Sequence, residues 1–74
     1  MDLRRVIAKN LRGYRLKRGL TQEALAGRVG IGPNHLARIE RGEEGLTLER
    51  WAKISKALKI EPYLLLVSES YKNT

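Results

Sequence analysis

Residues 33–41 place hydrogen-bonding side chains at the spacing of one helix face. If Leu36 and Ile39 point toward a core, the opposite side of this helix carries residues at i, i+3, i+4 and i+7: Asn34, Ala37, Arg38 and Arg41. An arginine can form two parallel hydrogen bonds with O6 and N7 of guanine, and an asparagine can do the same with N6 and N7 of adenine. This face therefore has the chemistry to read base edges in the major groove of double-stranded DNA. Ala37 offers a methyl group to thymine, and Pro33 adds apolar surface without a donor.

A second group of residues suits the phosphate backbone rather than the bases. Thr21 can cap a helix that begins at Gln22, and a helix N-terminus offers free N–H groups and a positive dipole end to an anion. Thr21 and Gln22 are therefore candidates for phosphate contacts. The other candidates are side chains that carry, or can carry, positive charge: Arg12, Arg15, His35 and Arg41. Two alternatives remain: His35 is a surface or partly packed side chain, and any of the arginines is merely solvated.

The sequence does not support catalytic or metal-binding chemistry. The chain has one histidine and no cysteine, so nothing completes a zinc site with His35. Glu43 and Glu44 are adjacent and project in different directions, which is not the arrangement of a paired-carboxylate cleft. We therefore expect a protein that is not an enzyme and that binds neither a cofactor nor a metal ion.

Short amphipathic helices must position these residues. The periodicity predicts helices over residues 2–18, 21–29, 33–41, 47 or 48–59 and, after Pro62, 63 to about 67. Gly30 is the residue most able to adopt the left-handed conformation of a sharp turn, and Gly42 ends the third helix. No strand pattern is present, so we expect an all-α fold.

The first and fourth predicted helices supply much of the expected core. The first has an apolar side formed by Leu3, Ile7, Leu11 and Tyr14. The fourth has a buried face formed by Leu48, Trp51, Ser55 and Leu58, with Ala52 and Ile54 flanking it. The polar residues 68–74 are expected to form a flexible tail.

Positive charge is distributed unevenly along the chain. Its 74 residues include 15 Lys and Arg against 8 Asp and Glu, which gives a net charge of +7. Residues 1–18 hold seven of the basic side chains and one acidic one, Asp2. Such a balance favours a polyanionic partner, although a charged helix face can also be simply solvated. The first helix is therefore expected to supply much of the attraction to DNA.

Length and hydropathy restrict the organisation of the protein. Residues 1–74 correspond to one domain with a modest core, and no linker separates an effector-binding domain. The longest apolar run, 63–67, has five residues, whereas a membrane span needs about twenty. We therefore expect a cytoplasmic protein that is associated with the nucleoid when it is bound to DNA.

Residues 19–42 resemble the helix-turn-helix of the Cro/C1 or XRE-like family of bacterial and phage regulators. The residues that carry the resemblance lie in both helices, the turn and the flanking segments: Arg15, Gly19, Leu20, Thr21, Gln22, Leu25, Ala26, Gly30, Leu36, Ile39, Glu40, Arg41 and Gly42. The likeness extends over residues 6–67. It implies a five-helix, lambda-repressor-like DNA-binding domain with a central motif at 21–41, similar to Cro-like regulators or restriction-modification controllers.

The resemblance also implies roles for individual residues. The base-reading positions of the family correspond to Pro33, Asn34, Ala37 and Arg38. Gln22 is similar to the family's phosphate-binding glutamine. Arg15 and Glu40 match two residues that form an internal ion pair in the family, so the resemblance implies that Glu40 holds Arg15 in place.

Two departures from the family pattern affect the expected strength of binding. Gly32 and Pro33 leave the recognition helix without a side-chain cap and with few donors at its start. Glu43 and Glu44 place two carboxylates in the loop that follows this helix. Either the loop points away from the duplex, or binding is weaker and more dependent on salt.

The apolar run 63–67 predicts a contact outside the fold. Five consecutive apolar residues in a short helix cannot all face inward: Tyr63, Leu64, Leu65, Leu66 and Val67. We expect part of this stripe to be buried in a homodimer, whose two recognition helices would bind a palindromic operator as a repressor or autoregulator. The alternative is a protein-interaction module, such as an antitoxin or an antagonist, that touches DNA weakly.

Overall fold

The computed structural model describes residues 2–73, and all of the regular secondary structure in these residues is helical. The elements in chain order are α1 (Leu3–Lys17), α2 (Gln22–Val29), α3 (Pro33–Glu40), α4 (Leu48–Leu58) and the two 3₁₀ segments η1 (Pro62–Leu66) and η2 (Ser70–Asn73). The described residues contain no strand, so the expectation of an all-α fold is confirmed. None of these helices is long and apolar enough to span a lipid bilayer.

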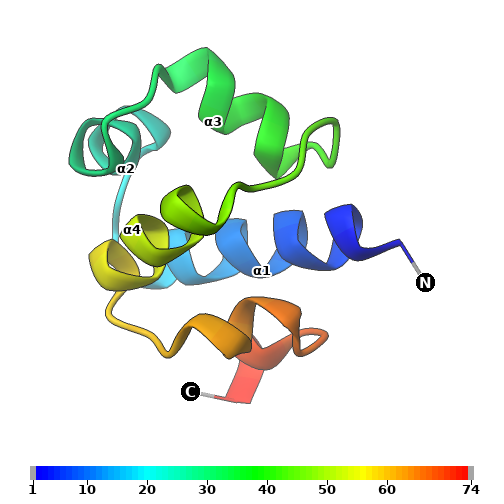
Figure 1. Ribbon diagram of the computed structural model, residues 1–74. Helices are drawn as coiled ribbons and strands as arrows, with labels where there is room; N and C mark the ends of the chain where they lie inside the picture. The colour runs from blue at the N-terminus through cyan, green and yellow to red at the C-terminus, as the bar shows by residue number, and fades with distance from the viewer. Residues whose placement is uncertain (1, 74) are drawn as a thin grey trace.

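The helices are arranged so that α3 lies at one side of the molecule and the two 3₁₀ segments lie at the other (Figure 1). Between them, α1 contacts α3 on one side and η1 and η2 on the other. α2 packs against both α3 and α4. α1 is therefore the scaffold that joins α3 to the C-terminal segment.

Local sequence signals explain where the helices begin. The Thr21 hydroxyl accepts a hydrogen bond from the Ala24 N–H at 3.0 Å, and the Thr47 hydroxyl accepts one from the Arg50 N–H at 3.1 Å. Gly30 follows α2 with a φ of 84°, in the left-handed region where a side chain is disfavoured. α3 then begins with Pro33 and has no side-chain cap, as expected from Gly32. The sequence from the cap of α2 to the start of α3 thus folds as its local chemistry predicts.

The prediction of a fifth α-helix was wrong. Residues 62–66 form a 3₁₀ segment, in which the Leu64 N–H donates to the Glu61 carbonyl at 3.0 Å. Pro62 contributes no N–H, and the chain is already extended at Val67, so too few residues remain for a stable α-helical ladder. Four α-helices are therefore present in the described part of the chain.

The core collects fully buried side chains from every α-helix and from η1. Its members are Leu11, Tyr14, Leu25, Ala26, Val29, Leu36, Ile39, Ile54, Leu58 and Leu65. Leu48 was expected on the buried face of α4 but is 85% exposed, because it is the first residue of α4 and lies at the edge of that face. Ile54, expected only to flank the face, is fully buried. Leu3, at the start of α1, is likewise half exposed.

Residues 68–73 were predicted to be part of a flexible tail, but they fold back onto α1. The Tyr14 hydroxyl donates to the Ser70 hydroxyl at 2.8 Å, and the latter donates to the Leu64 carbonyl at 2.6 Å. The buried Asn10 amide donates to the carbonyls of Leu65 and Val67, both at 2.9 Å. Polar groups on the face of α1 thus anchor this segment, and only Thr74 of the predicted tail lies outside the described residues.

Candidate nucleic-acid interface

The recognition face predicted from helical spacing is exposed on α3. Leu36 and Ile39 are buried, at 0% and 1% exposure, and fix the rotation of the helix. Pro33, Asn34 and Arg38 are consequently exposed, and Ala37 is half-buried. Because α3 is the outermost helix on its side of the molecule, this face is accessible to a large ligand (Figure 1). The four residues expected to read bases therefore share one surface.

A shallow hollow joins this face to the start of α2. Its volume is about 490 Å³, and its walls are formed by Arg15, Thr21, Gln22, Glu23, Pro33, Asn34 and Ala37. The hollow brings the expected phosphate contacts of α2 next to the first turn of α3. The structure thus places together residues that are up to 22 positions apart in the sequence, from Arg15 to Ala37. It also adds Glu23, a carboxylate that sequence reasoning did not consider at this point.

Glu40, at the end of α3, connects α3 to both α1 and α2. The expected ion pair with Arg15 is present, with Nε–Oε2 and Nη2–Oε1 distances of 2.7 and 3.0 Å. The Gln22 amide donates to the same carboxylate at 3.1 Å. Arg15 is 7% exposed, and it also donates to the Leu20 carbonyl at 2.8 Å. The geometry therefore favours a positioning role for Arg15, which presents little surface to a phosphate.

The loop after α3, residues 41–47, does not point its carboxylates away from the helix. Glu43 forms two short contacts with Arg41, with Nε–Oε2 at 2.7 Å and Nη2–Oε1 at 3.2 Å. The hydrogen bond to Glu43 raises the pKa of the exposed Arg41 guanidinium, and the same bond lowers the pKa of the Glu43 carboxyl. This pair therefore stays ionised over a wide range of pH.

Glu44 lies between two other side chains of α3. One carboxylate oxygen is 2.9 Å from His35 Nε2, and the other is 3.5 Å from Arg38 Nε. The His35 side chain is 23% exposed and is thus partly packed. The described residues contain no cluster of ligands suited to a metal ion. The sequence identified Glu43 and Glu44 as unusual, but no local signal predicts which side chains a loop carboxylate will meet.

Basic residues that sequence reasoning did not single out flank the recognition side. A Cβ built on Gly45 would lie 3.8 Å from Arg4 Nε, and one built on Gly42 would lie 3.6 Å from Arg5 Cγ. The first turn of α1 therefore runs beside the loop 41–47. Arg12, which was singled out, is exposed further along α1. The excess charge of residues 1–18 already contained Arg4 and Arg5 and was the signal that could have identified them.

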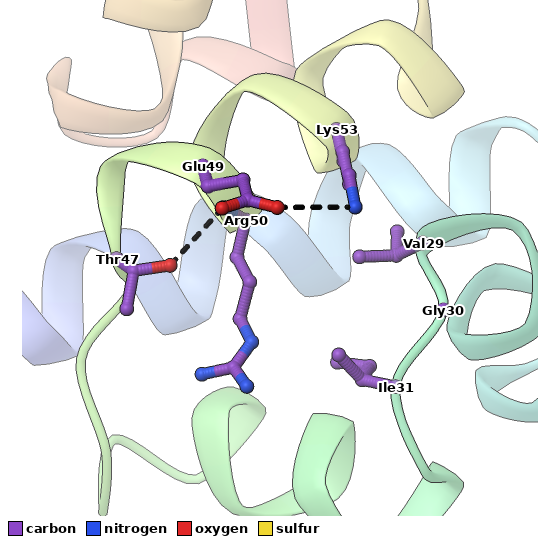
Figure 2. A pocket seen from close by; sticks show the side chains of 7 residues that line it. All are labelled: Val29, Gly30, Ile31, Thr47, Glu49, Arg50 and Lys53. Carbon is purple, nitrogen blue, oxygen red and sulfur yellow. Dashed lines mark hydrogen bonds and ion pairs between the residues drawn. The ribbon is translucent and has the colours of Figure 1, made fainter.

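A second hollow of about 340 Å³ lies between the turn after α2 and the first turns of α4. Figure 2 shows Arg50 extending from α4 into this space toward α3, whereas Lys53 is held by Glu49 at 3.4 Å. Arg50 forms no ion pair with any carboxylate in residues 2–73. Its guanidinium is thus a further cation directed toward α3 that periodicity alone could not place.

The chain matches a known family over most of its length. The family model described as helix-turn-helix, HTH_3, matches residues 11–65. The control protein C.SmaI of Serratia marcescens is 34% identical over 73 residues, which cover 99% of this chain and 87% of that protein. The control protein C.BamHI of Bacillus amyloliquefaciens is 35% identical over 66 residues, covering 88% and 82% of the two chains.

Solved structures have the same arrangement of helices. The restriction-modification controller protein C.AhdI from Aeromonas hydrophila superposes with a TM-score of 0.80 at 34% identity, over 84% of this chain and 94% of that one. The hypothetical transcription factor NHTF from Neisseria superposes with a TM-score of 0.87 at 32% identity, over 97% and 83% of the two chains. Similarity therefore extends well beyond the two helices of the motif.

Proposed function

This chain belongs to the Cro/C1-type helix-turn-helix family, and we propose that it is a transcriptional regulator that binds a specific double-stranded DNA operator through α3. The observation that carries the proposal is the exposed face of α3, where a guanidinium and a carboxamide lie one turn apart on a helix whose other side is buried. Arg38 would donate to a guanine and Asn34 to an adenine. Ala37 and Pro33 would contribute close apolar contact.

Phosphate contacts would surround this reading face and fix its register. The start of α2 supplies Thr21 and Gln22, whose helix end favours an anion. The cationic candidates are Arg4, Arg5, Arg12, His35, Arg41 and Arg50. Arg15 acts differently, because it holds Glu40 and thereby fixes α3 against α1. This division predicts that most of the salt-dependent affinity comes from outside α3.

The regulator would act as a homodimer through an apolar surface on the side away from the reading face. Leu48, Trp51, Ala52, Pro62, Tyr63 and Leu66 line a hollow of about 380 Å³. Val67 is 46% exposed beside the end of η1 and could extend this surface. One residue of the apolar run 63–67 that was expected at the interface does not reach the surface: Leu65 is completely buried in the core. Leu64 is only partly accessible.

Twofold symmetry would place two copies of α3 about 34 Å apart, one turn of DNA, and the operator would be a palindrome. We propose repression or autoregulation as its action, in line with the designation of C.SmaI and C.BamHI as control proteins. The position of the operator relative to a promoter would decide the direction of the effect.

The same apolar surface favours a second candidate function, a module that binds another protein and touches DNA weakly. One experiment separates the two candidates: selection of bound sequences from a random duplex pool, followed by footprinting on the enriched duplex. A palindrome with a protected site supports the regulator and its dimer. A pool without enrichment would contradict sequence-specific binding and support the protein-interaction module.

A further inference from the structure

Two side chains of α3, and a third directly after it, each lie close to a carboxylate of the loop 41–47. His35 and Arg38 share Glu44, and Arg41 is held by Glu43. Every one of these side chains is at least partly accessible, from 23% for His35 to 57% for Arg41. Exposed ion pairs contribute little to folding stability. We therefore expect these contacts to influence DNA binding at the adjacent face of α3 rather than the stability of the fold.

The two glutamates engage their arginines in different ways. The distance between Arg38 Nε and the Glu44 oxygen is 3.5 Å and no hydrogen bond joins the two side chains, so the terminal amino groups of the guanidinium keep their donors available. Those groups together can make a bidentate contact with guanine. The other oxygen of Glu44 is buried and lies 2.9 Å from His35 Nε2, a close contact that lacks hydrogen-bond geometry but leaves the carboxylate little room to move. Glu44 is thus placed to restrict the orientation of Arg38 while the terminal amino groups of Arg38 stay available for hydrogen bonds with a base.

Glu43 engages Arg41 through both Nε and Nη2. A planar fork of this kind is the geometry in which a guanidinium also grips a phosphate. A phosphate must therefore displace Glu43 from that edge or use the remaining donors of Arg41. The negative charge of Glu43 also repels the backbone of any duplex, whatever its sequence.

We propose that Glu44 is a specificity-determining residue that positions Arg38 for base readout, whereas Glu43 lowers affinity for all DNA by occupying Arg41. Prior restriction of Arg38 reduces the side-chain entropy that is lost when it binds a base. Glu44 thereby increases the difference between the operator and other sequences. Glu43 weakens binding to the operator and to other sequences equally, so it leaves the difference between their affinities unchanged. This inference rests on the proposed function of sequence-specific DNA binding.

The test compares affinities for the duplex selected from the random pool and for a scrambled duplex of the same length and composition. The preference is measured as the dissociation constant for the scrambled duplex divided by that for the selected duplex. In Glu44→Gln this ratio should fall by about tenfold, within the range of one bidentate base contact. Glu44→Asp keeps the charge but shortens the side chain, so it should lower the ratio without strengthening binding to the scrambled duplex. In Glu43→Gln both duplexes should bind a few-fold more tightly at low salt, by similar factors, and this gain should shrink as salt is added.

Glu69→Gln is the matched control. Glu69 is an accessible carboxylate paired with Lys9 and Lys72, both at 3.3 Å, and it directly precedes η2, a segment that lies on the side opposite α3 (Figure 1). The change removes the same charge and the same kind of ion pair, and it should shift both affinities slightly and leave their ratio unchanged. Circular dichroism and thermal melting of each variant check that the fold is intact.

A double-mutant cycle tests whether Glu44 acts through Arg38. In an Arg38→Ala background, Glu44→Gln should no longer change the ratio. The proposal is overturned if Glu44→Gln shifts both duplexes equally, if its effect on the ratio persists without Arg38, or if Glu43→Gln changes the ratio. Wild-type protein with no preference for any duplex would overturn the proposed function as well, so the two failures are distinguishable.

Discussion

Gly13 of α1 and the ring of Tyr71 lie in direct apposition, without space for a side chain on the glycine. A Cβ at position 13 would overlap the ring carbons of Tyr71. The same ring meets Tyr14 edge to face, with centroids 6.3 Å apart and planes at 77°. A glycine in the middle of a helix, which is normally unfavourable, thus provides the flat surface on which the C-terminal segment docks.

This contact predicts a context-dependent effect of Gly13→Ala on stability. In the Tyr71→Ala background the change should stabilise α1 by about 1 kcal/mol, the usual advantage of alanine in a helix interior. In the wild-type background the displaced ring should cancel this gain and increase cleavage after Tyr71 by chymotrypsin. Urea denaturation of the four proteins measures the coupling, and equal effects of Gly13→Ala in both backgrounds would contradict the contact.

Two asparagines should give opposite phenotypes. Asn10→Ala should lower the free energy of unfolding by about 2 kcal/mol, because the carbonyls of Leu65, which is buried, and Val67, which is partly buried, lose their donor. Asn34→Ala removes an exposed amide and should change stability by less than about 0.5 kcal/mol. It should, however, reduce the preference for the selected duplex. Chemical denaturation and DNA binding are measured on both variants. A stability loss in Asn34→Ala, or none in Asn10→Ala, would contradict the roles given to the two asparagines.

The ion pair between Arg15 and Glu40 should contribute to stability, unlike the exposed pairs. Glu40→Gln should destabilise the protein by about 3 kcal/mol, because the buried Arg15 guanidinium would lose its counter-charge. Arg41→Ala, which breaks the exposed pair with Glu43, is the control and should cost less than about 0.5 kcal/mol. Chemical denaturation compares them, and similar losses in both variants would count against a special role for the buried pair.

Arg38 and Arg12 should differ in the kind of DNA binding that they support. Arg38→Ala should weaken binding to the selected duplex by about 1–3 kcal/mol and leave the scrambled duplex almost unaffected. Arg12→Ala should weaken both duplexes alike and reduce the salt dependence of binding by about one phosphate contact. Titrations at several salt concentrations make the comparison. An equal loss on both duplexes in Arg38→Ala would exclude it as a base reader.

The apolar surface predicts the effect of one added charge on assembly. Leu48→Glu should shift the protein from dimer to monomer, because a carboxylate would be desolvated at the proposed interface. Leu16→Glu, at a leucine that is 55% exposed on α1, is the matched control and should leave assembly unchanged. Light scattering at a concentration well above that used for DNA binding reports the mass. A monomeric wild type under these conditions would argue against a preformed dimer.

The central motif could be predicted from sequence because its determinants are local. Thr21 caps α2, Gly30 adopts the left-handed conformation, and Leu36 with Ile39 sets the rotation of α3. Each signal acts within a few residues of its effect. The exposed face that is proposed to read bases follows from that rotation.

The C-terminal third could not be predicted in the same way, because its conformation depends on distant partners. Leu65 is buried and Leu66 is 41% exposed in a segment that the Asn10 side chain of α1 holds by hydrogen bonds. Ser70 is buried through its hydrogen bond with Tyr14. Sequence periodicity describes one helix at a time and contains no information about such long-range anchors. The loop contacts of Glu43 and Glu44 escaped prediction for the same reason.

The separation of buried and exposed positions on α3 also bears on how proteins of this family diverge. Leu36 and Ile39 provide the burial of the helix, whereas Pro33, Asn34 and Arg38 are exposed. Exposed positions of this type tolerate substitution with little loss of stability. Point mutations at these positions could therefore change the DNA sequence that is bound while the fold stays stable. After gene duplication, two copies could come to bind different operators without passing through an unstable variant.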